Sequence, residues 1–245
     1  MKTGAARESA RSVVRFAFVE ENGSTMTSTF EGEDALRKDL ARLGKRLYKL
    51  GFMPGTSGNL SVRLDSKFIL ATPTGVSKSM LGREDMVIID IEGRQYSGSR
   101  KVTSEIGMHL AIYNLRPDIQ AVVHSHPPIA TGFACAGRAL DEPLCSEAVM
   151  TLGSVPLARY ATTGTEEVAA SLAEFIPDHE AILMANHGVV TYGKTPMDAF
   201  MKMETVEHCA QIALVVTQLG SGLPIQQDKL EALMHARTRY ALNMA

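Results

Sequence analysis

Leucines spaced three and four residues apart begin the regular part of the sequence. They occur at Leu36, Leu40, Leu43, Leu47 and Leu50, and Gly51 follows them. This spacing predicts an amphipathic helix from Glu33 that covers one face of a core and ends at the glycine.

Short β-prone runs follow this helix. Apolar residues alternate over 60–64, and the apolar runs 68–71 and 86–91 have strand length, so three strands are expected. Turn-forming residues fill 54–59 and 72–79. The segment 54–59 therefore predicts a glycine-rich loop that joins the helix to the first strand.

The second half of the chain mixes helical and strand patterns. A short helix is expected over 105–115, capped by Thr103 or Ser104 and ended by Pro117. Further strands are expected over 121–125, 182–185 and 189–192, and further helices over 165–175, 196–219 and 227–242. The sequence shows no repeat or linker, so one layered α/β domain over 31–245 is the prediction.

The first thirty residues lack such a pattern. Val13 to Val19 is a short apolar run that Arg15 interrupts, and Glu20 and Glu21 follow where a signal peptide would carry small residues. We expect 1–30 to form a loose arm, and Met26 is a candidate for the physiological start.

Composition narrows the class of protein. The 245 residues are 45% hydrophobic and 21% charged, which is typical of a globular protein. A net charge of −2 provides no basic field for nucleic acid or anionic lipid, and no apolar stretch approaches the roughly 18 residues of a membrane span. Three cysteines without CxxC spacing argue against a disulfide framework, so the cytoplasm is the expected compartment.

Two histidines stand two residues apart at the end of an expected strand. Because residues two apart in a strand point to the same face, His124 and His126 could reach one metal ion. The pair fits a structural or surface role equally well. His187 follows another expected strand and precedes Gly188; taken alone, it is typical of an ordinary loop histidine.

Five motifs taken together resemble the class II aldolase/adducin-domain family, and especially its short bacterial enzymes that act on ketose phosphates such as L-fuculose-1-phosphate. The motifs are Gly55-Thr56-Ser57-Gly58-Asn59-Leu60-Ser61, Thr72-Pro73-Thr74-Gly75, Thr103-Ser104-Glu105, His124-Ser125-His126 and Asn186-His187-Gly188. They occur in the family's order and approximate spacing within 36–219. Five ordered motifs are far more specific than any one of them.

The resemblance implies a metal site and a phosphate site. His124, His126 and His187 would bind one zinc ion per subunit, with Glu105 beside the metal and ligating it before substrate arrives. The positions similar to the family's phosphate-binding residues are Thr56, Gly58, Asn59, Thr74, Gly75, Thr103 and Ser104. Any one of these could instead be an ordinary turn residue or helix cap.

The implied reaction is the reversible cleavage of a small ketose 1-phosphate to dihydroxyacetone phosphate and an aldehyde. The cation would stabilise the enediolate charge, and Glu105 would exchange the proton on the enediolate carbon, provided that burial raises its affinity for protons. A 3-oxo-tetronate 4-phosphate decarboxylase is the alternative. Similar epimerases usually carry aspartate at position 105 and similar dehydratases generally lack the glutamate, while an adducin-like binding module would lack the catalytic set that this chain retains.

Three further residues have weaker assignments. Glu147 lies where some relatives place a second acid/base that serves a neighbouring subunit, although it could be a solvated carboxylate. Tyr240 is the nearest candidate for the tyrosine that similar aldolases supply from their C-terminal segment, and His109 is expected to pack beside the site.

The resemblance also implies an architecture. Members of the family are three-layer α/β/α proteins with a central mixed, mostly antiparallel sheet. They commonly form homotetramers with active sites near subunit interfaces, and we expect both features here.

Overall fold

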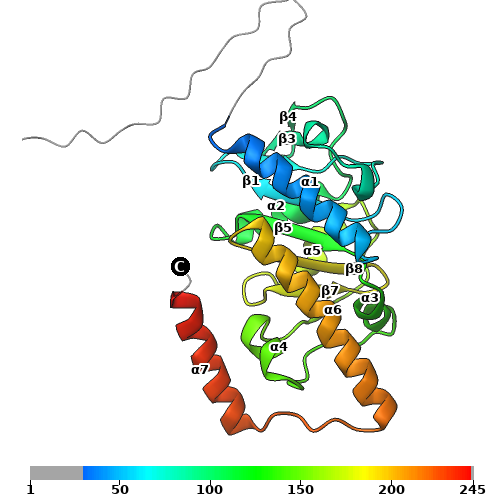
Figure 1. Ribbon diagram of the computed structural model, residues 1–245, viewed down its shortest axis with the longest axis vertical. Helices are drawn as coiled ribbons and strands as arrows, with labels where there is room; N and C mark the ends of the chain where they lie inside the picture. The colour runs from blue at the N-terminus through cyan, green and yellow to red at the C-terminus, as the bar shows by residue number, and fades with distance from the viewer. Residues whose placement is uncertain (1–29, 244–245) are drawn as a thin grey trace, which may run out of the picture.

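The computed structural model describes residues 30–243, and almost all of the expected arm 1–30, including Met26, lies outside them. Eight strands form one sheet in the order β4-β3-β2-β1-β5-β8-β7-β6 (Figure 1). The strands are β1 (Asn59–Arg63), β2 (Phe68–Ala71), β3 (Val87–Asp90), β4 (Gln95–Ser97), β5 (Ala121–Ser125), β6 (Leu157–Ala158), β7 (Ala181–Met184) and β8 (Gly188–Gly193). Only β6 and β7 pair in parallel, so the expected mixed, mostly antiparallel sheet is confirmed.

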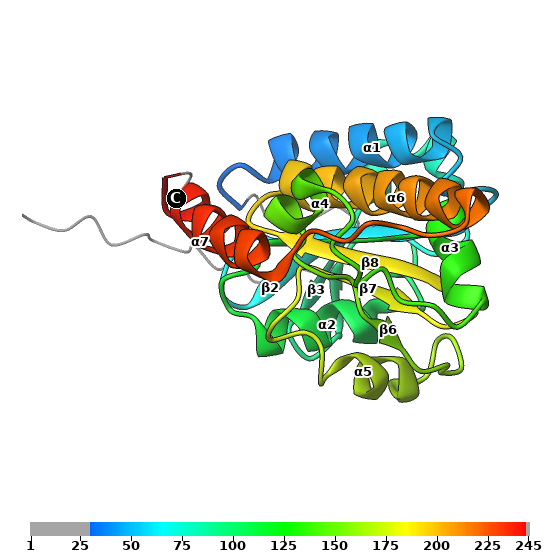
Figure 2. The same cartoon turned by 90° about the horizontal axis from the view of Figure 1, so that it is seen from below.

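Helices cover both faces of this sheet and complete the expected three layers (Figure 2). The α-helices are α1 (Glu33–Lys49), α2 (Ile106–Leu115), α3 (Pro128–Cys135), α4 (Ser146–Thr151), α5 (Glu166–Leu172), α6 (Pro196–Leu219) and α7 (Gln227–Asn243). Two short 3-10 helices, η1 (Lys78–Met80) and η2 (Arg83–Asp85), lie between β2 and β3. In Figure 2, α1 and α6 lie on one face and α2 and α5 on the other.

The two faces of the sheet enclose separate apolar cores. Val123 faces the core beneath α1 and α6 together with Leu43 and Phe200, whereas its neighbour Val122 faces the core above α2 and α5 together with Leu172. Successive side chains of a strand point to opposite faces, and both faces of this sheet are covered by an apolar core. The central strands are therefore apolar at nearly every position and not only at every second one.

The predicted strands and long helices are present within one or two residues of their expected bounds, except that α5 ends at Leu172, three residues early. The helix expected over 105–115 begins at Ile106, and Glu105 occupies its N-cap position without a side-chain cap. Thr103 Oγ1 accepts the Glu105 backbone N–H at 3.4 Å, so Thr103 supports this turn from outside the helix. Among the described residues, six short elements were not predicted: β4, α3, α4, β6 and the two 3-10 helices.

The centre of the sheet aligns three segments that are distant in sequence. β5 pairs antiparallel with β1 on one side and with β8 on the other, so that Asn59 and Val190 flank His124. The hairpin between β7 and β8 has a three-residue turn, 185–187, whose central Asn186 is left-handed with φ of 55°. This turn brings His187 to the end of β5.

The helices of residues 30–243 include none with both the length and the apolar character that a membrane span requires. At the C-terminal end of the described chain, α7 packs on α4 and lies apart from the body of the sheet (Figure 1).

Candidate metal centre

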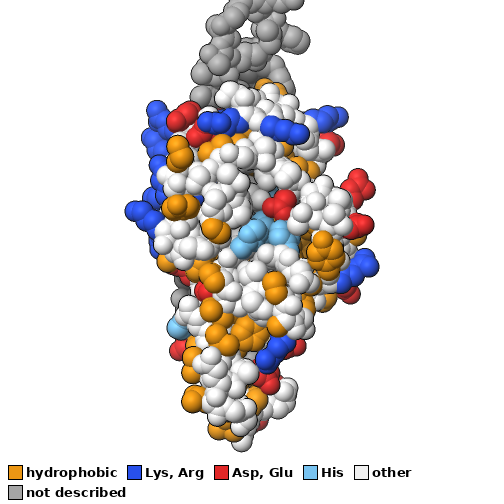
Figure 3. Space-filling model, turned by 90° about the vertical axis from the view of Figure 1, so that its right-hand side faces the viewer, with side chains coloured by type: hydrophobic (Ala, Val, Ile, Leu, Met, Phe, Trp, Pro, Cys, Tyr) orange, Lys and Arg blue, Asp and Glu red, His pale blue; other side chains and the backbone are white. Residues whose placement is uncertain are grey.

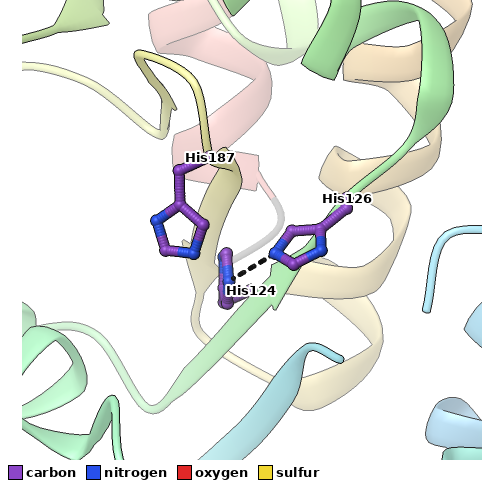
Figure 4. A group of neighbouring side chains, drawn as sticks. All are labelled: His124, His126 and His187. Carbon is purple, nitrogen blue, oxygen red and sulfur yellow. Dashed lines mark hydrogen bonds between the residues drawn. The ribbon is translucent and has the colours of Figure 1, made fainter. Parts of the chain in front are cut away.

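Three imidazoles converge at the ends of β5 and the β7–β8 hairpin (Figure 4). One nitrogen from each of His124, His126 and His187 lies within 4.8 Å of the other two. His124 Nε2 and His126 Nε2 are 3.1 Å apart. His124 is buried and the other two are half-buried. Histidine atoms are visible in a hollow of the surface next to an acidic side chain (Figure 3), so a small molecule can reach the cluster.

A glycine makes the convergence possible. A Cβ at position 188 would lie 2.4 Å from His126 Cδ2 and 2.7 Å from the Ser125 carbonyl oxygen. Real Cβ atoms essentially never come this close, so the Asn-His-Gly turn must end in glycine for the hairpin to approach β5.

Backbone contacts orient two of the imidazoles. His124 Nδ1 lies 2.9 Å from the Val189 carbonyl oxygen, which can only accept, so Nδ1 carries the proton and Nε2 presents its lone pair to the cluster. The His126 backbone N–H donates to the Phe52 carbonyl oxygen at 2.8 Å and holds the chain where it leaves β5. A fixed tautomer of this kind is typical of histidines that bind a metal.

Glu105 completes the cluster from the start of α2. Its Oε1 lies 3.0 Å from His187 Nε2, and its Oε2 lies 3.4 Å from His124 Nε2. Oε1 is buried and has no hydrogen-bond partner. Four ligands held at about 2.0–2.1 Å by a tetrahedral metal ion are about 3.4 Å apart, so these separations and the unpartnered Oε1 fit a metal bound by three histidines and the glutamate.

Burial keeps His124 and His126 neutral. Loss of water lowers the pKa of His124 to about 3, although the charge of Glu105 opposes the shift. Burial and the neighbouring His187 also lower the pKa of His126. Because a metal binds neutral imidazole, both side chains are in their ligating form at neutral pH.

The pKa of the Glu105 carboxyl is set by its neighbours more than by its burial. Burial acts to raise its pKa, but the imidazoles of His124 and His187 and a hydrogen bond from Asn59 lower the pKa below its usual value. The condition that burial raises its affinity for protons is therefore not met in this arrangement, because polar neighbours outweigh the loss of water. Glu105 is ionised, which is the form that binds a cation.

A buried hydrogen-bond chain leads away from Glu105. Asn59 Nδ2 donates to Glu105 Oε2 at 2.8 Å, and Asn59 Oδ1 accepts from His109 Nε2 at 2.6 Å. His109 Nδ1 then accepts from Ser61 Oγ at 2.7 Å, and Ser61 Oγ lies 2.8 Å from the Tyr113 hydroxyl. This direction of donation requires neutral His109, and burial lowers the pKa of His109 to about 4. His109 therefore positions Asn59, as its place beside the site led us to expect.

The predicted phosphate-binding residues come from three loops that the fold joins. Thr72 Oγ1 accepts the Leu60 N–H at 3.1 Å, and the Thr72 carbonyl oxygen accepts the Thr103 N–H at 3.3 Å. The Thr74 N–H donates to the Lys101 carbonyl oxygen at 3.0 Å. These bonds connect the loops that carry the seven positions, and the binding of phosphate there stays a prediction.

Exposure divides the seven positions. Thr56, Thr74, Gly75 and Ser104 are exposed, and their hydroxyl and backbone N–H groups can reach an anion. Gly58, Asn59 and Thr103 are buried. Both ends of the Asn59 amide are already bonded to Glu105 and His109, so in this arrangement Asn59 serves the carboxylate.

Glu147 and Tyr240 belong to two helices that contact each other, α4 and α7. Glu147 is exposed in the first turn of α4, a helix that contacts α6 and α7. Tyr240 belongs to α7. Within the described residues no recorded contact joins Glu147 to the histidines, and its catalytic role stays a prediction.

Two residues beside the site were not assigned from sequence. Lys78 is buried and bridges the Thr56 and Val76 carbonyl oxygens, although its neighbours in sequence resemble an ordinary surface turn. Ser61 belongs to one of the family motifs and carries the hydrogen bond that links His109 to Tyr113. Ser61 could have been noticed from sequence, because a serine at an inward-facing strand position needs a hydrogen-bond partner.

Comparison with known proteins agrees with this geometry. Residues 38–214 match the model of the family described as Class II Aldolase and Adducin N-terminal domain. The chain is 34% identical over 199 residues to 5-deoxy-D-ribulose 1-phosphate aldolase of Bacillus thuringiensis serovar kurstaki, covering 80% of this chain and 92% of that protein. It is also 34% identical over 189 residues to 3-oxo-tetronate 4-phosphate decarboxylase of Escherichia coli, covering 75% of this chain and 88% of that protein.

A solved structure of L-fuculose 1-phosphate aldolase has the same fold. The two superpose with a TM-score of 0.78 at 31% sequence identity, over 82% of this chain and 95% of the other. The matches extend over 88–95% of the lengths of these three proteins, so the likeness is not limited to a part of them.

The buried neutral state of His109 predicts a loss of stability in acid. The unfolded chain binds a proton near the ordinary histidine pKa of 6.5, whereas folded His109 does so only near 4, so the free energy of unfolding falls as pH falls between these values. At roughly 1.4 kcal/mol per pH unit, this single group contributes a loss of about 2 kcal/mol from about pH 7 to about pH 5.

Urea unfolding of chelator-treated protein at these two pH values measures this loss. His109→Gln should lose less stability on acidification than the parent, and His208→Gln, on the exposed face of α6, is the matched control. Equal acid sensitivity of the parent and His109→Gln would show that His109 is not the responsible group.

Proposed function

This chain belongs to the class II aldolase and adducin family, and we propose that it is a zinc-dependent aldolase that reversibly cleaves a small ketose 1-phosphate to dihydroxyacetone phosphate and an aldehyde. The observation that carries the proposal is the meeting of three imidazoles and one ionised carboxylate at a point open to solvent. Three histidine ligands with a position left for substrate are typical of catalytic zinc.

His124, His126 and His187 would hold the zinc, with Glu105 as a fourth ligand before substrate arrives. When bound, zinc supplies a Lewis acid that stabilises negative charge on the substrate oxygens as the carbon–carbon bond breaks. The hydrogen bond from His124 Nδ1 to Val189 and the approach of the hairpin at Gly188 fix the positions of the ligands.

Glu105 would move the proton on the substrate carbon. Its Oε1, which lies 3.0 Å from His187 Nε2 in the cluster, would accept and return the proton, while Asn59 holds Oε2. In the cleavage direction, the carbon of the dihydroxyacetone phosphate half that was part of the broken bond gains this proton. The hydroxyl group that becomes the aldehyde oxygen loses one. Glu147 is our candidate for the second acid/base, acting in the site of a neighbouring subunit of a homotetramer.

The exposed loops at 55–57 and 74–75 would hold the substrate phosphate through hydroxyl and backbone N–H groups. A ketose phosphate of the L-fuculose-1-phosphate kind is our first choice, since a solved aldolase acting on that sugar shares the fold over most of this chain. We place the enzyme in the cytoplasm, where the thiols of Cys135, Cys145 and Cys209 stay reduced.

Decarboxylation of a 3-oxo-tetronate 4-phosphate is the second candidate. It is favoured by the 34% identity to the Escherichia coli protein of that name. Loss of carbon dioxide also leaves negative charge on a carbon next to a carbonyl, so the same cation and carboxylate would serve it.

A cleavage screen separates these candidates. Zinc-loaded protein is incubated with ketose 1-phosphates and, in parallel, with a 3-oxo-tetronate 4-phosphate, while dihydroxyacetone phosphate and carbon dioxide are measured with and without a chelator. Chelator-sensitive dihydroxyacetone phosphate is the expected product. Carbon dioxide without dihydroxyacetone phosphate would replace the aldolase by the decarboxylase.

Loss of one imidazole should release the metal. His126→Ala removes one of the three proposed histidine ligands. Zinc content should therefore fall from one ion per chain to well below one after dialysis, and activity should be lost. Metal analysis of the purified protein measures this, with His208→Ala as the control. Zinc retained at one ion per chain in His126→Ala would contradict the ligand assignment.

Replacement of the carboxylate should separate binding from turnover. Glu105→Gln keeps the size of the side chain but cannot exchange a proton, so kcat should fall by about 100-fold or more while phosphate affinity and the melting temperature stay close to those of the parent. Steady-state kinetics measures the loss, and Glu174→Gln, at an exposed position, is the control. Near-normal turnover in Glu105→Gln would mean that another group carries the proton.

A further inference from the structure

A lysine is buried beneath the two loops that are expected to bind phosphate. Lys78 is 1% exposed and is among the largest fully buried side chains of the described residues. Its Nζ donates to the Thr56 carbonyl oxygen at 3.3 Å and to the Val76 carbonyl oxygen at 3.1 Å. The lysine therefore bridges the loop 54–59 and the loop that follows β2.

The Lys78 charge has no ion-pair partner among residues 30–243, because the two oxygens that it contacts are neutral carbonyls. Burial lowers the pKa of Lys78 to about 8, and the more distant charge of Glu105 offsets this only in part. A buried lysine without a counterion is costly and is rarely retained for stability alone. An ammonium group has three N–H donors, so one remains for another ligand.

The position of Lys78 indicates which anion would supply the missing charge. The loops that it bridges through the Thr56 and Val76 carbonyl oxygens carry the exposed residues Thr56, Thr74 and Gly75. Lys78 contacts Thr56, and the same loop leads to Asn59, whose amide donates to Glu105, so the loop 54–59 connects this lysine to the histidine cluster.

We propose that Lys78 is the cation that recognises the phosphate monoester of the substrate from beneath these two loops, and that it makes the site select phosphorylated over unphosphorylated ketoses. The inference rests on the proposed function, since it assigns a residue to the phosphate half of the same substrate. A dianionic phosphate would bring two negative charges to a cation that otherwise has only carbonyl partners.

The alternative role of Lys78 is a purely structural bridge between the loops. Lys78→Gln separates the two roles, because an amide can still donate to a carbonyl but carries no charge. Lys78→Met removes both the donors and the charge. Lys67→Gln, at an exposed position in the turn between β1 and β2, is the matched control for loss of a lysine charge.

The experiment compares zinc-loaded parent, Lys78→Gln, Lys78→Met and Lys67→Gln. Isothermal titration calorimetry with inorganic phosphate and with dihydroxyacetone phosphate measures affinity, and kcat/KM is measured for a ketose 1-phosphate and for the same ketose without phosphate. Both Lys78 variants should bind the phosphates about 10- to 100-fold more weakly, which is the loss expected for a hydrogen bond to a charged group. Cleavage of the unphosphorylated ketose and zinc content should stay at the parent's values in Lys78→Gln.

The outcomes distinguish this inference from the proposed function. Parent protein that binds and cleaves phosphorylated ketoses, with unchanged phosphate affinity in Lys78→Gln, would overturn the role of Lys78 alone. An equal loss for phosphorylated and unphosphorylated sugars in Lys78→Gln would also overturn it, because a structural bridge predicts that result. Parent protein that binds neither inorganic phosphate nor dihydroxyacetone phosphate would overturn the proposed substrate and this inference with it.

Discussion

The pairing of β5 with β1 on one side and β8 on the other is the constraint on which the site depends. A shift of one residue in either pairing would turn His124 to the opposite face of the sheet and remove the hydrogen bond from its Nδ1 to Val189. The apolar residues around it prevent such a shift, because Val122 and Val123 must face different cores. The same packing that stabilises the fold therefore sets the geometry of the imidazoles.

Buried polar groups are the second common feature of this region. The Glu105 carboxylate accepts a hydrogen bond from Asn59, Asn59 accepts one from His109, and His109 accepts one from Ser61. The side chains of Asn59 and His109 are therefore satisfied at both of their polar ends. Exceptions include Glu105 Oε1 and Ser125 Oγ, which lack hydrogen-bond partners, and the Lys78 ammonium group, which lacks a counterion. Since buried polar groups are normally satisfied, these departures mark where a cation and an anion would bind.

Much of the fold could be predicted because its long elements carry strong periodic patterns. The leucines of α1 and the apolar runs of β5 and β8 have only one compatible interpretation, whereas α4 and β6 are too short for periodicity to be visible. The proposed ligand residues were predicted from the family's motifs, but their separations depend on strand register, which no local pattern contains. Lys78 was missed because a lysine in a turn is usually exposed, and the lowered pKa of Glu105 depends on neighbours that are distant in sequence.

The absence of space at Gly188 has a consequence for attempts to alter the enzyme. Any side chain at this position would meet both the His126 ring and the backbone of β5, so a library of variants should lose metal binding with every substitution there. The exposed loop residues Thr56 and Thr74 lack this restriction. Directed evolution toward new substrates can therefore draw its diversity from those two loops, while the turn between β7 and β8 has to be kept constant as part of the metal scaffold.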